Sequence, residues 1–447
     1  MPVETAAQSH YVLGIPVDFI LFALTLAGVA IFNGKALRVA LLGLAAITLY
    51  KLAFTGFKNG TGPTGLATHM AHEWVLLANL LLLLVGFALL SRHFEKSNVP
   101  DVMPAILPDD WKGGFALLAI IAVLSSVLDN IAAALLGGTM AKHVFRGKVH
   151  IGYIAAIVAA SNAGGAGSVL GDTTTTMMWI DGVSPLVVVE DYVASAVALL
   201  IFGIPAALKQ QRFSPIVCDP APGTRIEWTR LAIVLAILVA AVVANIAANI
   251  YYPELLVEIP VIGLAVWAAI LLTAQIRKPD WGVMPRAFSG AIFLLALVTC
   301  ASMMPVETLP PASWHTAFGL GFVSAVFDNI PLTALALKQG GYDWGFLAFS
   351  VGFGGSMIWF GSSAGVAISN MFPEAKSAVG WLRHGWFIAP AYVIGFFVML
   401  AVLGWNADPG HKKQAAPPRS SAAISVTGTL AADVTGLSSK EIFIRAS

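Results

Sequence analysis

The chain has 447 residues, of which 58% are apolar and only 11% are charged, and its mean hydropathy is +0.82. A water-soluble globule of this length carries far fewer apolar residues, so the composition indicates an integral membrane protein. The 25 Lys and Arg residues nearly balance the 24 Asp and Glu residues, so the charge gives no reason to expect nucleic acid as a partner. The two cysteines, Cys218 and Cys300, lack the spacing of a metal site.

A short N-terminal segment, 1–14, precedes the first apolar run. That run has no Lys or Arg before it and no small-residue cleavage site after it, so we expect a membrane span and not a removable signal peptide. In all, ten apolar runs are long enough to cross the roughly 30 Å hydrocarbon layer as helices. They lie at 15–32, 36–54, 74–91, 151–180, 184–207, 229–250, 259–275, 288–304, 345–371 and 385–404.

Two further runs, 113–141 and 312–338, carry an Asp-Asn pair near their middle. A straight helix of either length would overshoot the bilayer. If both runs are re-entrant hairpins and the N-terminus lies outside, most Lys and Arg residues fall in cytoplasmic loops, as the positive-inside rule requires. Only Lys51, Lys58 and Lys338 then remain in outer loops. We therefore predict an all-α polytopic protein with about ten transmembrane helices and two re-entrant hairpins.

The pattern divides the chain into six parts. We expect the N-terminal segment, a group of N-terminal transmembrane helices, a first transport unit, connecting transmembrane helices, a second transport unit, and a polar tail rich in Ala, Ser and Pro that is mobile and has no role in transport. Their bounds are 1–14, 15–92, 113–207, 229–304, 312–404 and 405–447.

The two transport units repeat the same motifs. DNIAAAL from Asp129 matches DNIPLTAL from Asp328, and SNAGGAGSVLGDTTTT from Ser161 matches VGFGGSMIWFGSSAG from Val351. The two copies enter the membrane from opposite sides in the predicted topology. Inverted repeats of broken helices are recurrent in secondary transporters, with the binding site near the midplane where the copies meet.

Glycine pairs recur within these apolar motifs. Glycine weakens a helix, and unwound backbone at membrane depth is tolerated only where it is buried in protein or lines a cavity. Close packing of helices through small residues is the alternative interpretation. Because the pairs recur beside Asp-Asn and hydroxyl residues, we predict unwound backbone at Gly164, Gly165, Gly354 and Gly355.

Three acids, Asp129, Asp172 and Asp328, lie deep in apolar sequence, and no Lys or Arg in their segments can pair with them. A carboxylate at the bilayer centre is costly unless it is paired, hydrated or protonated, so each is a candidate for binding a cation or a proton. The hard oxygen groups around them suit alkali or alkaline-earth cations. The surrounding oxygen and amide groups belong to Asn130, Asn162, Thr173, Thr174, Thr175, Thr176, Asn329, Ser356, Ser362 and Ser363.

Other polar residues carry weaker signals. Asp18, Glu190 and Asp191 lie near the ends of their spans and are expected at the membrane interface. His69, His72 and Glu73 stand in the order HMAHE, which is not that of a metalloprotease. We expect this stretch to be a loop, with a pH-sensing histidine as the alternative.

DNIAAAL, NAGGAGSVLGDTTTTMMWI, DNIPLTAL and GGSMIWFGSSAG resemble the signature segments of the NhaD-type sodium/proton antiporters, which belong to an ion-transporter superfamily that also holds arsenite and dicarboxylate carriers. The chain departs from the family pattern at Gly167 and Val169, where an aromatic residue and a proline are usual. The resemblance implies two inverted units, each with a hairpin and a broken helix, and a homodimer. It also implies cation ligation at Asp129, Asn130, Asn162, Asp172, Thr174, Thr175, Ser324, Asn329, Ser356 and Ser363.

We therefore predict a secondary transporter of the plasma membrane, of the bacterial inner-membrane type, that exchanges Na⁺, with Li⁺ as an alternative ion, for H⁺. Cation and proton would compete for Asp129 and Asp172, with Asp328 and Ser362 close by, and no cofactor is needed. The partners are the two ions and the lipid bilayer. Sodium-coupled uptake of a dicarboxylate is the alternative, although three buried acids would repel an anion. No nucleophile paired with a base, metal-ligand cluster or nucleotide loop is visible, so we do not expect an enzyme.

Overall fold

A computed structural model describes residues 11–12, 14–32, 35–58, 60–102, 107–217, 225–252 and 255–408. The predicted N-terminal segment and C-terminal tail lie largely outside these ranges. Residues 405–408 of the tail are described, and there the Asn406 backbone N–H donates to Asp343 Oδ2 and the Trp344 indole N–H donates to Asp408 Oδ2. The described part of the chain is mostly α-helical, and its strands are one short antiparallel pair, β1 (Tyr11–Val12) and β2 (Ile15–Pro16), so the prediction of an all-α protein is confirmed.

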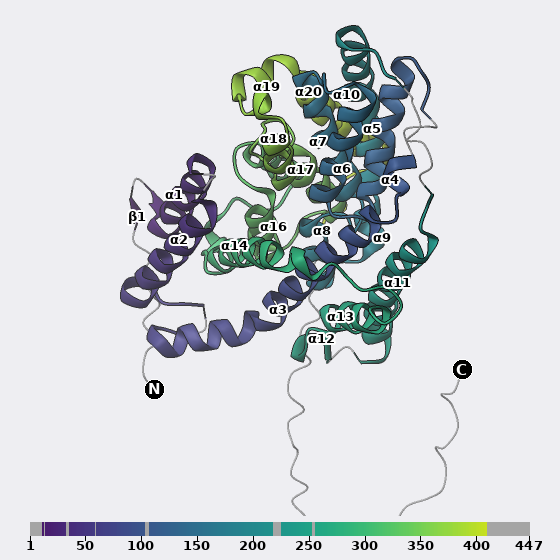
Figure 1. The fold of residues 1–447 in the computed structure, drawn as a ribbon. Coiled ribbons are helices and arrows are strands. Elements are labelled where there is room, and N and C mark those ends of the chain that lie inside the picture. The colour runs from purple at the N-terminus through teal and green to yellow at the C-terminus, as the bar shows by residue number, and fades with distance from the viewer. Residues whose placement is uncertain are drawn as a thin grey trace, which may run out of the picture. The chain divides into compact units, whose positions relative to one another are not determined.

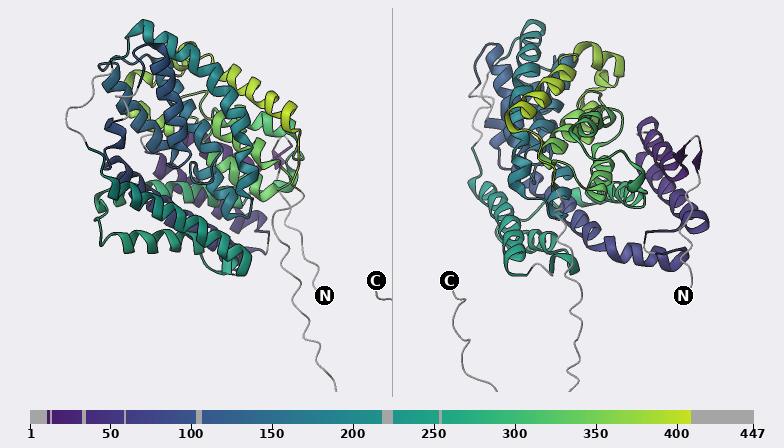
Figure 2. Two further views of the ribbon diagram at one scale, coloured as in Figure 1. Left: turned by 90° about the vertical axis from the view of Figure 1, so that its right-hand side faces the viewer. Right: turned by 180° about the vertical axis from the view of Figure 1, so that it is seen from behind.

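The first and the connecting helices lie outside the repeated motifs. α3 packs against α11, α13 and α14, and α2 packs against α1 and α14 (Figures 1 and 2). A π-helical turn, η2, extends α2. These elements are α1 (Val17–Ile31), α2 (Ala36–Tyr50), η2 (Lys51–Thr55), α3 (Gly62–Glu95), α4 (Val99–Val102), α11 (Trp228–Tyr251), α12 (Leu255–Glu258), α13 (Val261–Thr273), η4 (Trp281–Val283), α14 (Met284–Ser302) and η5 (Val306–Thr308).

The two predicted transport units share one order of elements. In each unit, two helices are followed by a helix that is broken in its middle, and a further helix ends the unit. The first unit comprises α5 (Trp111–Ser125), α6 (Asn130–Val144), α7 (Ile151–Ala166), α8 (Thr173–Ile180), α9 (Pro185–Val189) and α10 (Asp191–Phe213). The second comprises α15 (Trp314–Ser324), α16 (Asn329–Gln339), α17 (Trp344–Gly354), α18 (Ser363–Met371), η6 (Pro373–Ala375), α19 (Ala378–His384) and α20 (Ile388–Leu403).

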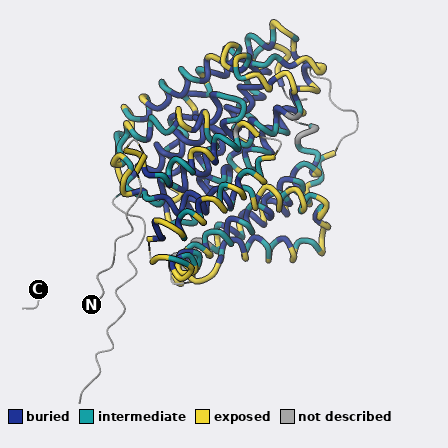
Figure 3. Tube along the Cα trace, turned by 90° about the vertical axis from the view of Figure 1, so that its left-hand side faces the viewer, coloured by how far each residue is buried: buried dark blue, intermediate teal, exposed yellow. Residues whose placement is uncertain are grey.

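The two units interlock. α6 of the first unit packs against α18 of the second, and α16 of the second packs against α8 of the first. α7 and α17 pack against each other at the centre, where every residue of α17 and nearly every residue of α7 is buried. Figure 3 shows this buried interior and the exposed positions along the outer helices. The two units therefore share one buried interior.

Four described helices, 36–55, 62–95, 185–213 and 281–302, are long and apolar enough to cross a membrane, and a fifth span results if the bent pair α19 and α20 is counted as one. Shorter apolar helices occupy the remaining predicted spans. Helix α3 starts at Gly62, twelve residues before the predicted span, so the expectation of a loop at His69, His72 and Glu73 is wrong. A helix can begin there because Pro63 occupies its first turn, where no intrahelical N–H bond is lost.

Two of the acids expected at the membrane interface are buried within the protein. Asp18 is 1% exposed, and its Oδ1 lies 3.1 Å from the Lys51 ammonium. Lys51 itself is buried in η2 and not in the expected loop, and it also donates to the Gly56 carbonyl at 3.2 Å. The partners are 33 positions apart, which explains why a local hydropathy pattern does not reveal the pair. Asp191, at the start of α10, is fully buried.

Candidate ion-binding site

Four helices begin at the centre of the molecule, and the residue before each is a predicted site residue. Asp129 precedes α6, Asp172 precedes α8, Asp328 precedes α16 and Ser362 precedes α18. Three of these side chains accept a backbone N–H of the helix that follows: Asp172 from Thr174, Asp328 from Ile330 and Ser362 from Gly365. Asp and Ser favour this capping position because their oxygens satisfy otherwise unpaired N–H groups.

Asp172 is the acid that links the two units. Its Oδ2 accepts a hydrogen bond from the Asn329 amide of the second unit at 3.2 Å, and its Oδ1 accepts the Thr174 N–H at 3.3 Å. The side chain is 3% exposed. Asp129 and Asp328 lie close enough for their charges to interact with that of Asp172. None of these three acids forms an ion pair with Lys or Arg in the part of the chain that the structure describes.

A second polar chain joins the units through Asn162 of α7, which is fully buried. Its amide nitrogen lies 3.0 Å from both Ser356 Oγ and Ser362 Oγ, and its oxygen accepts from Asn130 at 3.2 Å. Beside this chain, Ser363 donates to Asp328 Oδ2 at 3.1 Å. The structure therefore brings together most of the residues that the sequence singled out.

Two predicted ligands point elsewhere. Ser324 donates to the Val351 carbonyl at 2.6 Å, and Thr175 donates to the carbonyls of Ser168 and Asp172. These hydroxyls hold the helix breaks in shape. By contrast, the buried Thr174 side chain lies against the Asp172 carboxyl.

The glycine pairs lie beside the breaks, in the ends of their helices. Gly164 and Gly165 belong to the last turn of α7, Gly354 ends α17 and Gly355 caps it. The prediction that they form the unwound backbone is thus wrong for Gly164, Gly165 and Gly354, which are helical, whereas Gly355 is the first residue of the second break; the breaks lie at 167–172 and 355–362. The glycines serve close packing, since a Cβ on Gly164 would collide with the Ala122 carbonyl of α5 and one on Gly354 with the Gly321 carbonyl of α15.

Gly167, where the family has an aromatic residue, lies under the ring of Tyr192. Even a Cβ at this position would collide with that ring, and the Tyr192 hydroxyl donates to the Gly164 carbonyl at 3.2 Å. The aromatic group that fills this space therefore comes from α10 in this chain.

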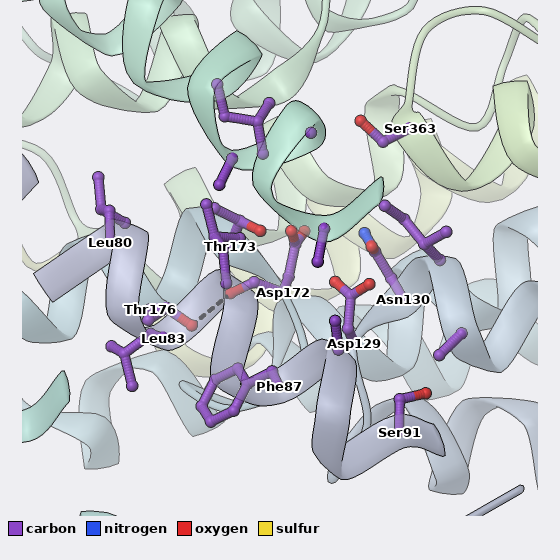
Figure 4. Close-up of a pocket in the computed structure, with 18 of the residues that line it drawn as sticks. Leu80, Leu83, Phe87, Ser91, Asp129, Asn130, Asp172, Thr173, Thr176 and Ser363 are labelled. Atoms are coloured by element: carbon purple, nitrogen blue, oxygen red, sulfur yellow. Dashed lines mark hydrogen bonds between the residues drawn. The ribbon is translucent and has the colours of Figure 1, made fainter. Parts of the chain in front are cut away.

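Asp328 lines a separate hollow of about 290 Å³, whereas a cavity of about 380 Å³ reaches Asp129 and Asp172. Asp129, Asn130, Asp172, Asn329 and Ser363 contribute its polar lining, together with Thr173 and Thr176, while the apolar wall comes from α3 and α14. Figure 4 shows the carboxyl groups of Asp129 and Asp172 near one another, with Leu80, Leu83 and Phe87 of α3 along the cavity. The wall on α3 was not predicted, because a uniformly apolar span gives no sign of which of its faces lines a cavity.

Charged residues surround the mouth of this cavity. Glu95 and Arg286 line both the cavity and an adjoining hollow of about 510 Å³, which Arg92 and Asp280 also line. Asp280 Oδ2 accepts from Lys96 at 2.8 Å and from Arg92 at 3.2 Å. The hydrogen bonds from Lys96 and then Arg92 lower the pKa of Asp280, which lies in a loop, to about 2.

No family model matches the chain. It is 27% identical over 327 residues to sodium/proton antiporter 1 of Arabidopsis thaliana, which covers 65% of this chain and 55% of that protein. It is 26% identical over 355 residues to the Na⁺/H⁺ antiporter NhaD of Alkalimonas amylolytica, covering 67% and 70%, and 26% identical over 412 residues to NhaD of Vibrio cholerae, covering 76% and 81%. The chain thus spans just over half the length of the Arabidopsis relative. These matches confirm the resemblance of the motifs, and the chain is a relative of the NhaD-type sodium/proton antiporters.

Proposed function

We propose that the protein is a secondary transporter that exchanges Na⁺, or Li⁺, for H⁺ across a membrane. The observation that carries the proposal is the buried carboxyl of Asp172, which lines the cavity beside Asp129 and has no Lys or Arg partner among the described residues. A buried carboxylate needs a cation or a proton to offset its charge. The names of the antiporter relatives support the same exchange.

Competition for one site couples the two fluxes. Carboxylates that lie near one another raise each other's affinity for protons, so one can release its proton near neutral pH and take a cation instead. The hydroxyls and amides of Asn130, Asn329 and Ser363 supply further oxygen ligands. Ser362 occupies the position of Asp172 in the second unit, and a serine can ligate sodium but cannot carry the proton.

Alternating access completes the mechanism. The cavity extends from Asp172 to the face that carries Arg92, Lys96 and Arg286, and basic loops favour the cytoplasmic side. We assign this arrangement to an inward-facing state. Rocking of the interlocked units would close this cavity and open the acids to the other face.

We further propose the topology and assembly expected from the sequence: ten spans, an N-terminus outside, residence in the plasma membrane, and a homodimer. The breaks between α5 and α6 and between α15 and α16 support two re-entrant hairpins. In the first of these, the position of Gly137 lies directly against Ile121, as in a tight helical hairpin. Light scattering of the detergent-solubilised protein would test the dimer.

Reconstituted vesicles test the function. Vesicles that contain the protein and a trapped pH indicator are given an outward sodium gradient in the presence of a permeant counter-ion. The proposal predicts acidification of the lumen that depends on sodium and does not occur with choline. Radiolabelled succinate uptake driven by sodium, without proton movement, would instead support the dicarboxylate alternative.

A further inference from the structure

The hollow beside Asp328, which we call the Asp328 hollow, is separate from the ion cavity and has a volume of about 290 Å³. Its walls come from α1, α2 and α14, from Ile131 of α6, and from the breaks before α16 and α18 together with α18 itself. Among the described residues that line it, Asp328 is the one charged residue and Ser363 is the one other polar residue. The hollow therefore presents a single carboxyl group within an apolar space.

The carboxyl group of Asp328 can accept a further partner. Its Oδ1 accepts the Ile330 N–H at 3.1 Å, and its Oδ2 accepts the Ser363 hydroxyl at 3.1 Å. An ionised carboxylate offers about four acceptor positions, so these two bonds do not exhaust it. The side chain is half-buried, and no Lys or Arg lines the hollow in the part of the chain that the structure describes. A cation that enters the hollow can therefore pair with Asp328.

The lining of the hollow favours an organic cation over an inorganic one. Hard inorganic cations need several oxygen ligands, and only two side chains of this lining carry oxygen. Three aromatic residues, Phe293, Phe327 and Phe360, line the same space. Aromatic rings attract an ammonium group, and apolar walls stabilise an apolar body by removing it from water. Small-molecule sites have this character, with a mostly apolar lining and few polar groups.

Two contacts connect the Asp328 hollow to the ion cavity. Ser363, which donates to Asp328, lines both spaces. Asn329 follows Asp328 in the chain and donates to Asp172 Oδ2 at 3.2 Å. A cation paired with Asp328 thus adds positive charge close to the residues that are proposed to bind sodium, and like charges repel.

We propose that the Asp328 hollow is a second cation site, for an organic ammonium ion with an aromatic or aliphatic body, and that its occupancy weakens sodium binding at Asp172. The ammonium group pairs with the Asp328 carboxylate, and the apolar body packs among the phenylalanines. The binding itself does not depend on the proposed function, whereas its effect on sodium rests on that function.

Titration calorimetry of the purified full-length protein tests the binding. The probe is 2-phenylethylammonium, which stays charged at neutral pH, and 2-phenylethanol is a neutral molecule of nearly the same shape. The wild-type protein should bind the ammonium ion at least roughly 10-fold more tightly than the alcohol, because a hydrogen bond to a charged group is stronger than one between neutral groups. Equal affinities would overturn the proposal and leave a hollow that takes neutral apolar molecules such as lipid chains.

Two variants locate the bound ion. Asp328→Asn should weaken ammonium binding at least roughly 10-fold, because it removes the charge. Ala36→Leu enlarges a side chain in the wall on α2, far along the chain from the acids, and should also weaken binding while leaving sodium-dependent proton flux in vesicles unchanged. Ala45→Leu, the same change at an exposed position of α2, should bind the probe as the wild-type protein does. Wild-type binding of the probe in both Asp328→Asn and Ala36→Leu would place the ion elsewhere and overturn the proposal.

Sodium titrations at rising concentrations of 2-phenylethylammonium test the connection between the sites. The apparent dissociation constant for sodium should rise by roughly 5-fold or more and then reach a plateau, since the two cations occupy different sites and weaken each other. A rise without a plateau would show that both cations compete for one site, and an unchanged constant would show that the sites are not coupled. Either result would overturn the proposed effect on sodium.

The outcomes distinguish this inference from the proposed function. If the wild-type protein exchanges sodium for protons but does not bind 2-phenylethylammonium, the inference fails and the proposed function stands. If the protein binds the ammonium ion at Asp328 but neither binds sodium nor exchanges it, the proposed function fails and the organic cation site stands.

Discussion

The Asn329 amide of the second unit donates a hydrogen bond to Oδ2 of Asp172 in the first unit at 3.2 Å. Both residues are almost fully buried, and each stands at the start of a helix. The acid to which we assign the ion is therefore positioned by the opposite repeat, which gives motion between the units a direct effect on the ion site.

Replacing Asn329 with Ala should weaken sodium binding. A hydrogen bond to a charged group contributes about 1.5–3 kcal/mol, so we expect the apparent sodium affinity to fall by roughly 10- to 100-fold. Thr139→Ala removes an exposed hydroxyl from α6 that bonds only its own helix backbone and serves as the control. Sodium-dependent proton flux at a series of sodium concentrations measures both. Unchanged affinity in Asn329→Ala would show that Asp172 does not need its partner in the second unit.

Gly164→Ala should destabilise the protein. The added Cβ would meet the Ala122 carbonyl, a backbone atom that cannot rotate away, and overpacking of this kind costs about 1–3 kcal/mol. We expect a lower melting temperature of the detergent-solubilised protein, with the same result for Gly354→Ala. Gly319→Ala in α15 adds a Cβ into open space and should leave the melting temperature unchanged or raise it. Equal melting temperatures for Gly164→Ala and Gly319→Ala would contradict the packing role.

Single cysteines test the proposed hairpins. In a background without Cys218 and Cys300, Lys112→Cys and Lys142→Cys should react with an impermeant reagent only from the cytoplasmic side, because the two ends of a re-entrant hairpin share one face. Pro311→Cys and Gln339→Cys should react only from outside. Labelling of positions 112 and 142 from opposite sides would make α5 and α6 a full crossing.

The Asp280 ion pairs should make stability depend on pH. The pKa of Asp280 is lowered to about 2 from about 3.9 in an unfolded chain, so its stabilising effect is fully present above about pH 4 and disappears as the pH falls through about 2. Asp280→Asn should lower the melting temperature at pH 7, and this difference should shrink toward pH 2 and at high salt. If the difference in melting temperature between Asp280→Asn and the wild-type protein does not change with pH, the stabilisation does not depend on the ionised Asp280 carboxyl.

Much of the site could be predicted from the sequence, because its residues fall in repeated motifs. Asp129, Asp172 and Asp328 stand out as acids within apolar runs, and the helix breaks next to them follow from segments too long for one span. The sequence also indicates that these residues cap helices, since Asp or Ser stands directly before each helix that begins at a break. The partner of each acid was not predictable, because Asn329 and Asp172 are 157 positions apart.

Other features depend on contacts between distant segments. The burial of Asp18 requires Lys51, and that of Asp191 requires the bundle around α10, so both acids appear interfacial in a local pattern. The role of Gly164 depends on the backbone of α5. A glycine pair in one segment does not distinguish an unwound backbone from a close helix contact.

The central claim is that sodium and protons compete at Asp172, and sodium-induced pH change in vesicles carrying Asp172 variants tests it most directly. Asp172→Asn cannot bind a proton or offset a cation with charge, so it should show no sodium-dependent proton flux. Asp172→Glu should shift the apparent sodium affinity and the pH optimum together, and Ser362→Ala should weaken sodium binding without moving the optimum. Sodium-dependent proton flux at the wild-type rate in Asp172→Asn would contradict the assignment and transfer it to Asp129 or Asp328.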